Sequence, residues 1–297
     1  MKEILTRYRN GNYTVFLLED GTKIRINNLD NLTPSFAESI DCTITKKCDG
    51  GCPYCYLGCT EEGKHADLHQ PIFDTLHYGQ ELALNGNDLS HPELHGFLVR
   101  MKKQGVICNI TVNQKHFLRD IDKIIDWSER GLIRGVGVSL TDSNDPMLYK
   151  GLYVMPNTVV HVIDGLLTEH DINNMADRDI KLLILGYKQL GRGDDYYVKH
   201  NRTIQDNIKL LRNHMQDIVP HFKVVSFDNL AIDHLEMKYH FTDEEWDKIY
   251  MGDEGQYTSY IDAVDKKYAV SSLAKPIGSY DEWTTVDMMF KHVREVA

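Results

Sequence analysis

From Ser39 onward, short apolar runs rich in β-branched residues alternate with amphipathic stretches of helical period. This alternation constrains the fold most, because neighbouring parallel strands need a crossover, usually a helix, between them. The run 181–187 is almost unbroken in apolar character, which is typical of a parallel strand covered on both faces. Strands are expected at 40–45, 80–84, 106–112, 133–140, 158–163, 181–187 and 222–227, with helices at 92–104, 115–130 and 202–219.

The repeated unit predicts an α/β fold whose parallel sheet curls into a partial or complete TIM-like (β/α) barrel. Upstream, two β-rich runs flank a turn at 10–12 and predict an N-terminal β-meander. Downstream, helical stretches, a hairpin turning near Asp265 and a final helix predict a C-terminal α/β-hairpin cap. We expect the meander to span 1–38, the barrel core 39–229, and the cap, which lacks cysteines, 230–297.

Length and charge limit the classes of function. The 297 residues are enough for one large barrel domain or two ordinary domains. The net charge of −11 argues against extended, sequence-independent binding of nucleic acid. No apolar run approaches the roughly 18 residues of a membrane span, and the N-terminus lacks the apolar core of a signal peptide. We therefore expect a cytoplasmic protein with no membrane partner.

Three cysteines, Cys48, Cys52 and Cys55, have the spacing C-x3-C-x2-C, with Tyr54 directly before the third. Three thiolates on one loop suit an iron–sulfur cluster in which one iron lacks a protein ligand and can bind a small molecule. The loop follows the first expected strand, at the edge of a barrel where active sites form. The motif therefore favours a catalytic cluster over a purely electron-carrying one.

Cys59 extends the spacing to C-x3-C-x2-C-x3-C and leaves two alternatives open. One is a structural zinc site, in which four thiolates complete a tetrahedron. The other is a ferredoxin-like electron carrier, whose usual spacing, C-x2-C-x2-C-x3-C-P, differs in the first interval and in the final proline. Under either alternative the chain would be a non-catalytic iron–sulfur or zinc-binding module.

The cysteine motif and its place after the first strand of a βα barrel resemble the radical S-adenosylmethionine (radical SAM) superfamily, over roughly 39–229. The resemblance implies that Cys48, Cys52 and Cys55 hold one [4Fe–4S] cluster that binds SAM. It implies an enzyme that reductively cleaves SAM to a 5′-deoxyadenosyl radical, which abstracts hydrogen from the substrate. An external electron donor of the flavodoxin or ferredoxin type is implied as well. The resemblance leaves open whether the enzyme is an oxidoreductase, a transferase or an isomerase.

The family's second signature, Gly-Gly-Glu-Pro at the end of strand two, binds the amino group of SAM. Here it corresponds to Asn85, Gly86 and Asn87, followed by Asp88, so three of the four positions differ. The side-chain carbonyl of Asn87 stands where the family has a carboxylate. The alternative is a polar turn before a helix.

Other SAM contacts are implied by position. Tyr54 corresponds to the family's aromatic residue whose backbone bonds to adenine, although it could equally serve packing. Asn113 at the end of strand three and Ser139 in strand four sit where family members contact ribose or the methionine part of SAM. Ordinary strand-end polar residues are the alternative for both.

Residues after strands six and seven are expected to face the substrate. Lys188 and Arg192 could bind the SAM carboxylate or an anionic substrate, or lie in a solvated loop. Asp228 could hydrogen-bond a substrate, or form the N-cap of the next helix. A C-terminal tail like that of peptide-modifying radical SAM enzymes, without its cysteines, favours a peptide over another small molecule as substrate. A nucleoside or nucleotide substrate is the alternative.

Overall fold

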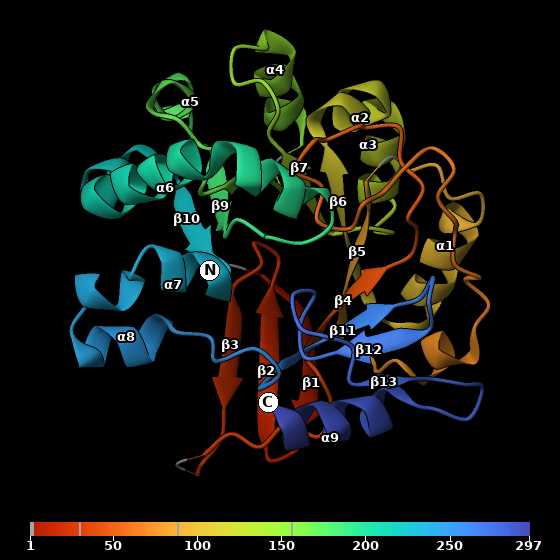
Figure 1. Cartoon of the computed structure of the whole chain (residues 1–297). Helices are drawn as coiled ribbons and strands as arrows, with labels where there is room; N and C mark the ends of the chain where they lie inside the picture. The colour runs from red at the N-terminus through yellow and green to blue at the C-terminus, as the bar shows by residue number, and fades with distance from the viewer. Residues whose placement is uncertain (1–2, 30, 88, 156) are drawn as a thin grey trace.

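The computed structural model describes residues 3–29, 31–87, 89–155 and 157–297, without the side chains at 86 and 87 (Figure 1). The strands are β1 (Ile4–Asn10), β2 (Tyr13–Leu18), β3 (Lys23–Ile26), β4 (Ser39–Thr43), β5 (Glu81–Asn87), β6 (Ile107–Asn113), β7 (Gly135–Ser139), β8 (Thr158–Ile163), β9 (Lys181–Leu185), β10 (Val224–Phe227), β11 (Thr258–Asp262), β12 (Lys267–Ala269) and β13 (Gly278–Ser279). The helices are α1 (Leu94–Gln104), α2 (Gln114–Arg119), α3 (Ile121–Glu129), α4 (Pro146–Val154), α5 (Glu169–Met175), α6 (Arg192–Ile218), α7 (Asn229–His234), α8 (Asp243–Ile249) and α9 (Val286–Val296), with short 3₁₀ turns at Pro71–Thr75, Val219–His221 and Met237–His240.

The main sheet has the strand order β10-β9-β8-β7-β6-β5-β4-β11-β12-β13. Strands β4 to β10 are parallel and follow one another along the chain, so their carboxyl ends lie at one edge. β11 adds in parallel beside β4, and β12 and β13 continue the sheet antiparallel. The prediction of an α/β fold with a large, mostly parallel sheet is confirmed. Within the described ranges no pairing joins β10 to β13, so the complete barrel is not found and the sheet is open.

Alternation along each strand separates a helix-covered face from a concave face. On β5, for example, Leu82 and Leu84 are buried in the main core, whereas Ala83 and Asn85 line a cavity on the concave side. Helices α1 to α6 lie along the outside of the curved sheet (Figure 1). In the part of the chain that the structure describes, no helix combines the length and apolar character that crossing a membrane requires.

Two helices differ from the expected ranges. The helix expected at 115–130 is interrupted at Asp120, whose φ of −108° and ψ of 21° end α2 and precede α3. The helix expected at 202–219 begins at Arg192 instead. Its first turns therefore replace most of the loop that was expected after strand six, and Arg192 stands at the helix start.

Helices α4 and α5 were not expected, although each carries a start signal in the sequence. Asp145 accepts a hydrogen bond from the N–H of Met147, and Pro146 occupies the first helical position. Thr168 and Asp171 form a reciprocal capping box at the start of α5. Both helices are short, so their periodic apolar pattern is weak compared with that of α6.

Strands β1, β2 and β3 form an antiparallel sheet of their own. Glu38, just before β4, is buried and binds this sheet: it accepts hydrogen bonds from Tyr13 Oη (2.6 Å) and Arg25 Nε (2.8 Å), and Lys23 Nζ lies 3.2 Å away. Burial would raise the pKa of Glu38, but the hydrogen bond from Arg25 and the charge of Lys23 hold it below its ordinary value. A charged cluster thus connects the meander to the main sheet.

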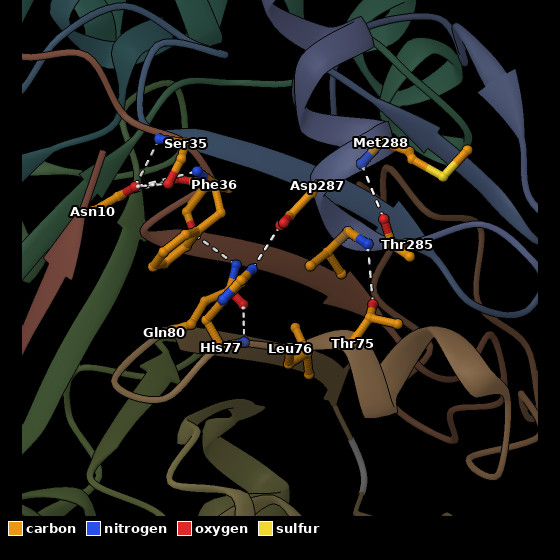
Figure 2. A network of polar contacts seen from close by, with 12 residues as sticks. Asn10, Ser35, Phe36, Thr75, Leu76, His77, Gln80, Thr285, Asp287 and Met288 are labelled. Carbon is orange, nitrogen blue, oxygen red and sulfur yellow. Dashed lines mark hydrogen bonds and ion pairs between the residues drawn. The ribbon is translucent and has the colours of Figure 1, made fainter. Parts of the chain in front are cut away.

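Figure 2 shows polar contacts that join three parts of the chain. Asn10, at the end of β1, accepts hydrogen bonds from the backbone N–H groups of Ser35 (2.8 Å) and Phe36 (3.2 Å). The Phe36 ring stacks on His77, with ring centroids 3.9 Å apart. His77 in turn contacts Asp287 of α9, with Nε2 and Oδ1 2.6 Å apart. The meander, the segment before β5 and the last helix are therefore one connected network.

Candidate functional site

A cavity of about 860 Å³ occupies the concave side of the main sheet. At the carboxyl edge of the strands, the cysteine loop (48–59) forms part of its wall. The opposite end is bounded by the end of β2 and the turn after it, 17–21. The C-terminal segment contributes Glu254 and the stretch 271–273. The cavity therefore reaches from the predicted cluster motif, along the strand interior, to the meander.

The thiols of the cysteine loop converge on this cavity. Cys48, Cys52, Cys55 and Cys59 all line it, with Cys48 and Cys59 buried and the other two half-buried. A methyl group built on Gly50 would lie 3.2 Å from Cys48 Sγ and 3.8 Å from Cys52 Sγ. Both sulfurs therefore crowd the same side of Gly50, and glycine leaves the space between them free.

Two N–H groups point at sulfur atoms in the first half of the loop. The backbone N–H of Gly50 donates to Cys48 Sγ (3.3 Å), and Asn113 Nδ2 donates to Cys52 Sγ (3.7 Å). Burial raises the pKa of the Cys52 thiol. Hydrogen bonds to sulfur are one of the features that set the reduction potential of an iron–sulfur cluster.

In the second half of the loop, Cys55 and Cys59 are paired. A hydrogen bond from the Cys59 thiol lowers the pKa of Cys55, and the positive charge of Arg192 acts in the same direction. The same pairing raises the pKa of Cys59. The two thiols are therefore close enough to share one proton, and the charge of Arg192 favours a thiolate at this pair.

Arg192, expected to bind SAM or an anionic substrate, contacts the cysteine loop. Its backbone N–H donates to the carbonyl oxygen of Cys55 (3.1 Å), Nε to that of Cys52 (3.0 Å) and the Nη1 group to that of Cys59 (2.8 Å). These three bonds fix the loop backbone against the start of α6. A role of Arg192 toward SAM or substrate stays a prediction.

Asn113, Ser139 and His161 are register partners on the adjacent strands β6, β7 and β8, and all three line the cavity. Asn113 Oδ1 also accepts from the N–H of Lys115 and so caps α2. Burial lowers the pKa of His161 to about 4, so its imidazole is neutral near pH 7. Two of the expected SAM contacts thus lie in one row. His161 was not predicted to line the site. Its place in the expected strand 158–163, at a position facing the concave side of the sheet, could have indicated it.

The expected counterpart of the Gly-Gly-Glu-Pro signature is only partly described. Asn85 lines the cavity and accepts a hydrogen bond from Thr43 Oγ1 (2.8 Å). For Gly86 and Asn87 the structure describes the strand backbone but not the Asn87 side chain, so the prediction for these two residues is untested. The backbone of Asn87 pairs with Val112 across an irregularity in the β5–β6 register.

Tyr54 and Lys188 both line the cavity, and each packs against the ring of a tyrosine. The Tyr54 ring meets Tyr196 of α6 edge-on, with centroids 5.9 Å apart. Lys188 Nζ lies 4.3 Å from the centre of the Tyr56 ring and donates to Ser272 Oγ (3.0 Å). The ammonium group is therefore held at the wall by the cysteine loop and the C-terminal segment.

Asp228 has two backbone partners. Its Oδ1 accepts from the N–H of Ala231 (2.8 Å), which caps α7, and from the N–H of Gly186 (2.9 Å) at the end of β9. Burial raises its pKa, and burial likewise raises that of Asp41, which lines the cavity from β4. The alternative that the sequence left open for Asp228, a helix N-cap, is what the geometry shows.

Comparisons with protein-family models and with curated proteins find no match. Two solved structures of Streptococcus suis SuiB are similar in fold, each at 10% sequence identity. SuiB bound to the precursor peptide SuiA has a TM-score of 0.59 over 90% of this chain and 82% of that chain. SuiB bound to S-adenosylmethionine has a TM-score of 0.61 over 96% and 88%. The α/β fold predicted from the βα alternation is confirmed: this chain shares the fold of SuiB over most of both chains.

Proposed function

We propose that this chain is a radical SAM enzyme that modifies a peptide. The observation that carries the proposal is that Cys48, Cys52 and Cys55 line one end of a cavity of about 860 Å³, at the carboxyl edge of the parallel strands. That edge is where folds of this kind gather their chemistry. The likeness to SuiB, whose structures hold S-adenosylmethionine or a precursor peptide, supports both parts of the proposal.

The residues present fit a [4Fe–4S] cluster. Cysteine thiolates are its usual ligands, and three of them leave one iron for SAM. The free space that Gly50 leaves between Cys48 and Cys52, and the N–H donors aimed at both sulfurs, suit a loop that wraps closely round a cluster. When bound, cluster and SAM would together supply reductive cleavage of SAM to a 5′-deoxyadenosyl radical, with the electron coming from an external flavodoxin or ferredoxin.

The chain's own share of the reaction is to bind, orient and exclude water. We propose that Asn113 and Ser139, with Tyr54 and the 85–87 turn, contact SAM. Asp41 and His161, which line the same cavity, would then face the substrate. Enclosing the reacting groups there keeps water from the radical.

A peptide is the substrate class that the site supports best. The cavity volume lies in the upper part of the range of roughly 300–1,000 Å³ that holds a small ligand. Its lining includes carboxylates, an imidazole and aromatic rings, which can take a peptide side chain by hydrogen bonds and packing. SuiB bound to its precursor peptide supports this class by likeness of fold.

Anaerobic reconstitution tests the cluster and the SAM chemistry. We expect about four irons and matching sulfide per chain, and release of 5′-deoxyadenosine from SAM after dithionite reduction. Both should be lost in Cys52→Ala and kept in Cys59→Ala, which removes the loop cysteine that is not assigned as a ligand. Zinc in place of iron, or a cluster that never cleaves SAM, would instead assign the chain to the non-catalytic metal-binding class.

A second measurement tests the substrate class. Peptide pools should accelerate 5′-deoxyadenosine release from the reconstituted protein, whereas nucleosides and nucleotides should leave the rate unchanged. Acceleration by nucleosides alone would favour the nucleoside- or nucleotide-modifying alternative.

A further inference from the structure

The residue that follows the first cysteine of the loop is held by a helix far along the chain. Asp49 contacts three side chains of α2: His116, through Nε2 to Oδ1; Arg119, through Nη1 to Oδ2 (3.3 Å); and Lys115, whose Nζ lies 3.6 Å from Oδ2. The three contacts place donors on both oxygens of the Asp49 carboxylate, His116 at Oδ1 and Arg119 and Lys115 at Oδ2.

His116 differs from the other two partners because its side chain is fully buried, whereas Arg119 and Lys115 are largely exposed. Its ring also packs against the loop itself. A methyl group built on Gly50 would lie 3.4 Å from His116 Cε1, beside the same two sulfurs of Cys48 and Cys52. The ligand atoms of Cys48, Asp49 and His116 all lie within 4.8 Å of one another. The imidazole of His116 thus packs against the first part of the cysteine loop, Cys48 to Gly50.

We propose that His116 is a positioning residue for the cysteine loop: by donating Nε2–H to Asp49, it fixes the placement of Cys48 and neutralises part of the charge beside it. The inference rests on the proposed function, since it takes the loop to hold an iron–sulfur cluster. Loss of a residue that orients metal ligands without binding the metal itself typically lowers metal affinity about 10- to 100-fold. Local charge and solvent access also set a cluster's potential, so His116 should affect both retention and potential.

The α2 helix contributes to the loop at a second point, which supports the assignment. Asn113, directly before α2, caps that helix through Oδ1 and donates Nδ2–H to Cys52 Sγ. One short helix therefore supports Cys52 through Asn113 and the Cys48–Asp49 pair through His116. Arg192, by contrast, contacts the loop at the carbonyl oxygens of Cys52 and Cys59.

The test compares two substitutions of His116. His116→Gln keeps an amide N–H near the place of Nε2, whereas His116→Leu removes the donor and keeps most of the bulk. Three quantities are measured on reconstituted protein: the rate of iron loss to a chelator, the midpoint potential of the cluster from a titration followed by electron paramagnetic resonance, and Tm. Arg119→Gln is the control, because it removes an exposed contact to the same carboxylate.

In His116→Leu we expect iron loss roughly ten-fold faster or more and a lower midpoint potential, because the carboxylate beside Cys48 loses its buried donor and more of its negative charge then stabilises the oxidised cluster. His116→Gln and Arg119→Gln should stay close to the unsubstituted protein. If His116→Leu retains its iron at the same potential, or if His116→Gln changes as much as His116→Leu, the proposal is overturned.

Asp49→Ala keeps the test decisive should His116→Leu fail to fold, since Asp49 is partly exposed. It should also lose iron faster, because the contact between Asp49 and His116 is lost in this variant as well. Iron loss at the rate of the unsubstituted protein would overturn the proposal. Failure of the proposed function can be told apart from failure of this proposal. It would be seen in the unsubstituted protein, which would bind zinc instead of iron or hold a cluster that does not cleave SAM.

Discussion

Arg192 Nε lies 3.0 Å from the carbonyl oxygen of Cys52, although the two residues are 140 positions apart in the chain. The same guanidinium reaches the carbonyl oxygen of Cys59 through Nη1. The start of the long helix α6 is therefore attached to the cysteine loop. Because backbone carbonyls inside a folded site need partners, this attachment contributes to the stability of the loop.

Arg192→Lys should weaken the attachment even though the charge is kept. A lysine ammonium is a single point donor and cannot span two carbonyl oxygens as the planar guanidinium does. We expect the free energy of unfolding of the cluster-free protein to fall by about 1–3 kcal/mol, measured by urea denaturation. Arg202→Lys, on the same helix with its side chain 94% exposed, should change it by less than about 0.5 kcal/mol. Equal effects of the two substitutions would argue against this role.

Asp228 should prove to be a structural cap. Asp228→Ala removes the acceptor of two backbone N–H groups, those of Ala231 and Gly186, and should lower the unfolding free energy by about 0.5–2 kcal/mol. Asp228→Asn, which can still cap, should cost much less. The measurement is urea denaturation of both variants without SAM or substrate. An Asp228→Ala protein of unchanged stability but weakened substrate binding would restore the role first expected from its position after strand seven.

The sequence predicted the parts of this structure that depend on local patterns. The apolar runs predict seven of the parallel strands, β4 to β10, and the spacing of the cysteines predicts a loop that gathers thiols after β4. The early start of α6 could not be found in this way. Its first turn includes Gly193 and two aspartates, which give no periodic apolar signal, and it is fixed by Arg192 binding a distant loop.

The candidate site shows the same division. Cys48, Cys52 and Cys55 could be identified because they lie close together in the sequence. Asp49 and His116 are 67 positions apart, and only the return of the chain from β6 into α2 brings them together. His161 faces the cavity because of the register of its strand. An apolar pattern predicts that 158–163 is a strand, but it does not predict which residues of the neighbouring strands lie beside His161.

Gly137, in the cavity wall, lies in close contact with the His161 side chain of the neighbouring strand. A methyl group built there would lie 2.2 Å from His161 Cε1, so Gly137→Ala must displace the imidazole. We expect a loss of about 1–3 kcal/mol in unfolding free energy from overpacking, measured by urea denaturation. Gly96→Ala, in the exposed face of α1 where nothing lies within 4 Å, should instead stabilise by roughly 0.5–1 kcal/mol. Relief of the loss in Gly137→Ala combined with His161→Ala would identify the imidazole as the obstacle.

His161 should make the protein less stable in mild acid. Burial lowers its pKa to about 4 in the folded chain, whereas an unfolded histidine has a pKa of about 6.5. Between these values the unfolded chain binds a proton that the folded chain does not, so this contribution to stability is complete above pH 6.5 and is lost as the pH falls toward 4. Relative to the unsubstituted protein, His161→Gln should therefore gain stability when the pH is lowered from 7 to 5, measured by urea denaturation at each pH.

His234 provides the matched control with the opposite sign. Its hydrogen bond to Asp164, with Nδ1 and Oδ2 2.7 Å apart, raises its pKa above the ordinary value. Its stabilising contribution is therefore complete at low pH and is lost as the pH rises through the folded pKa. His234→Gln should lose more stability at pH 5 than at pH 7, the reverse of His161→Gln. A trend parallel to that of His234→Gln would mean that the pKa of His161 is raised in the folded chain, and no trend would mean that it is ordinary. Either result would contradict an imidazole kept neutral by burial.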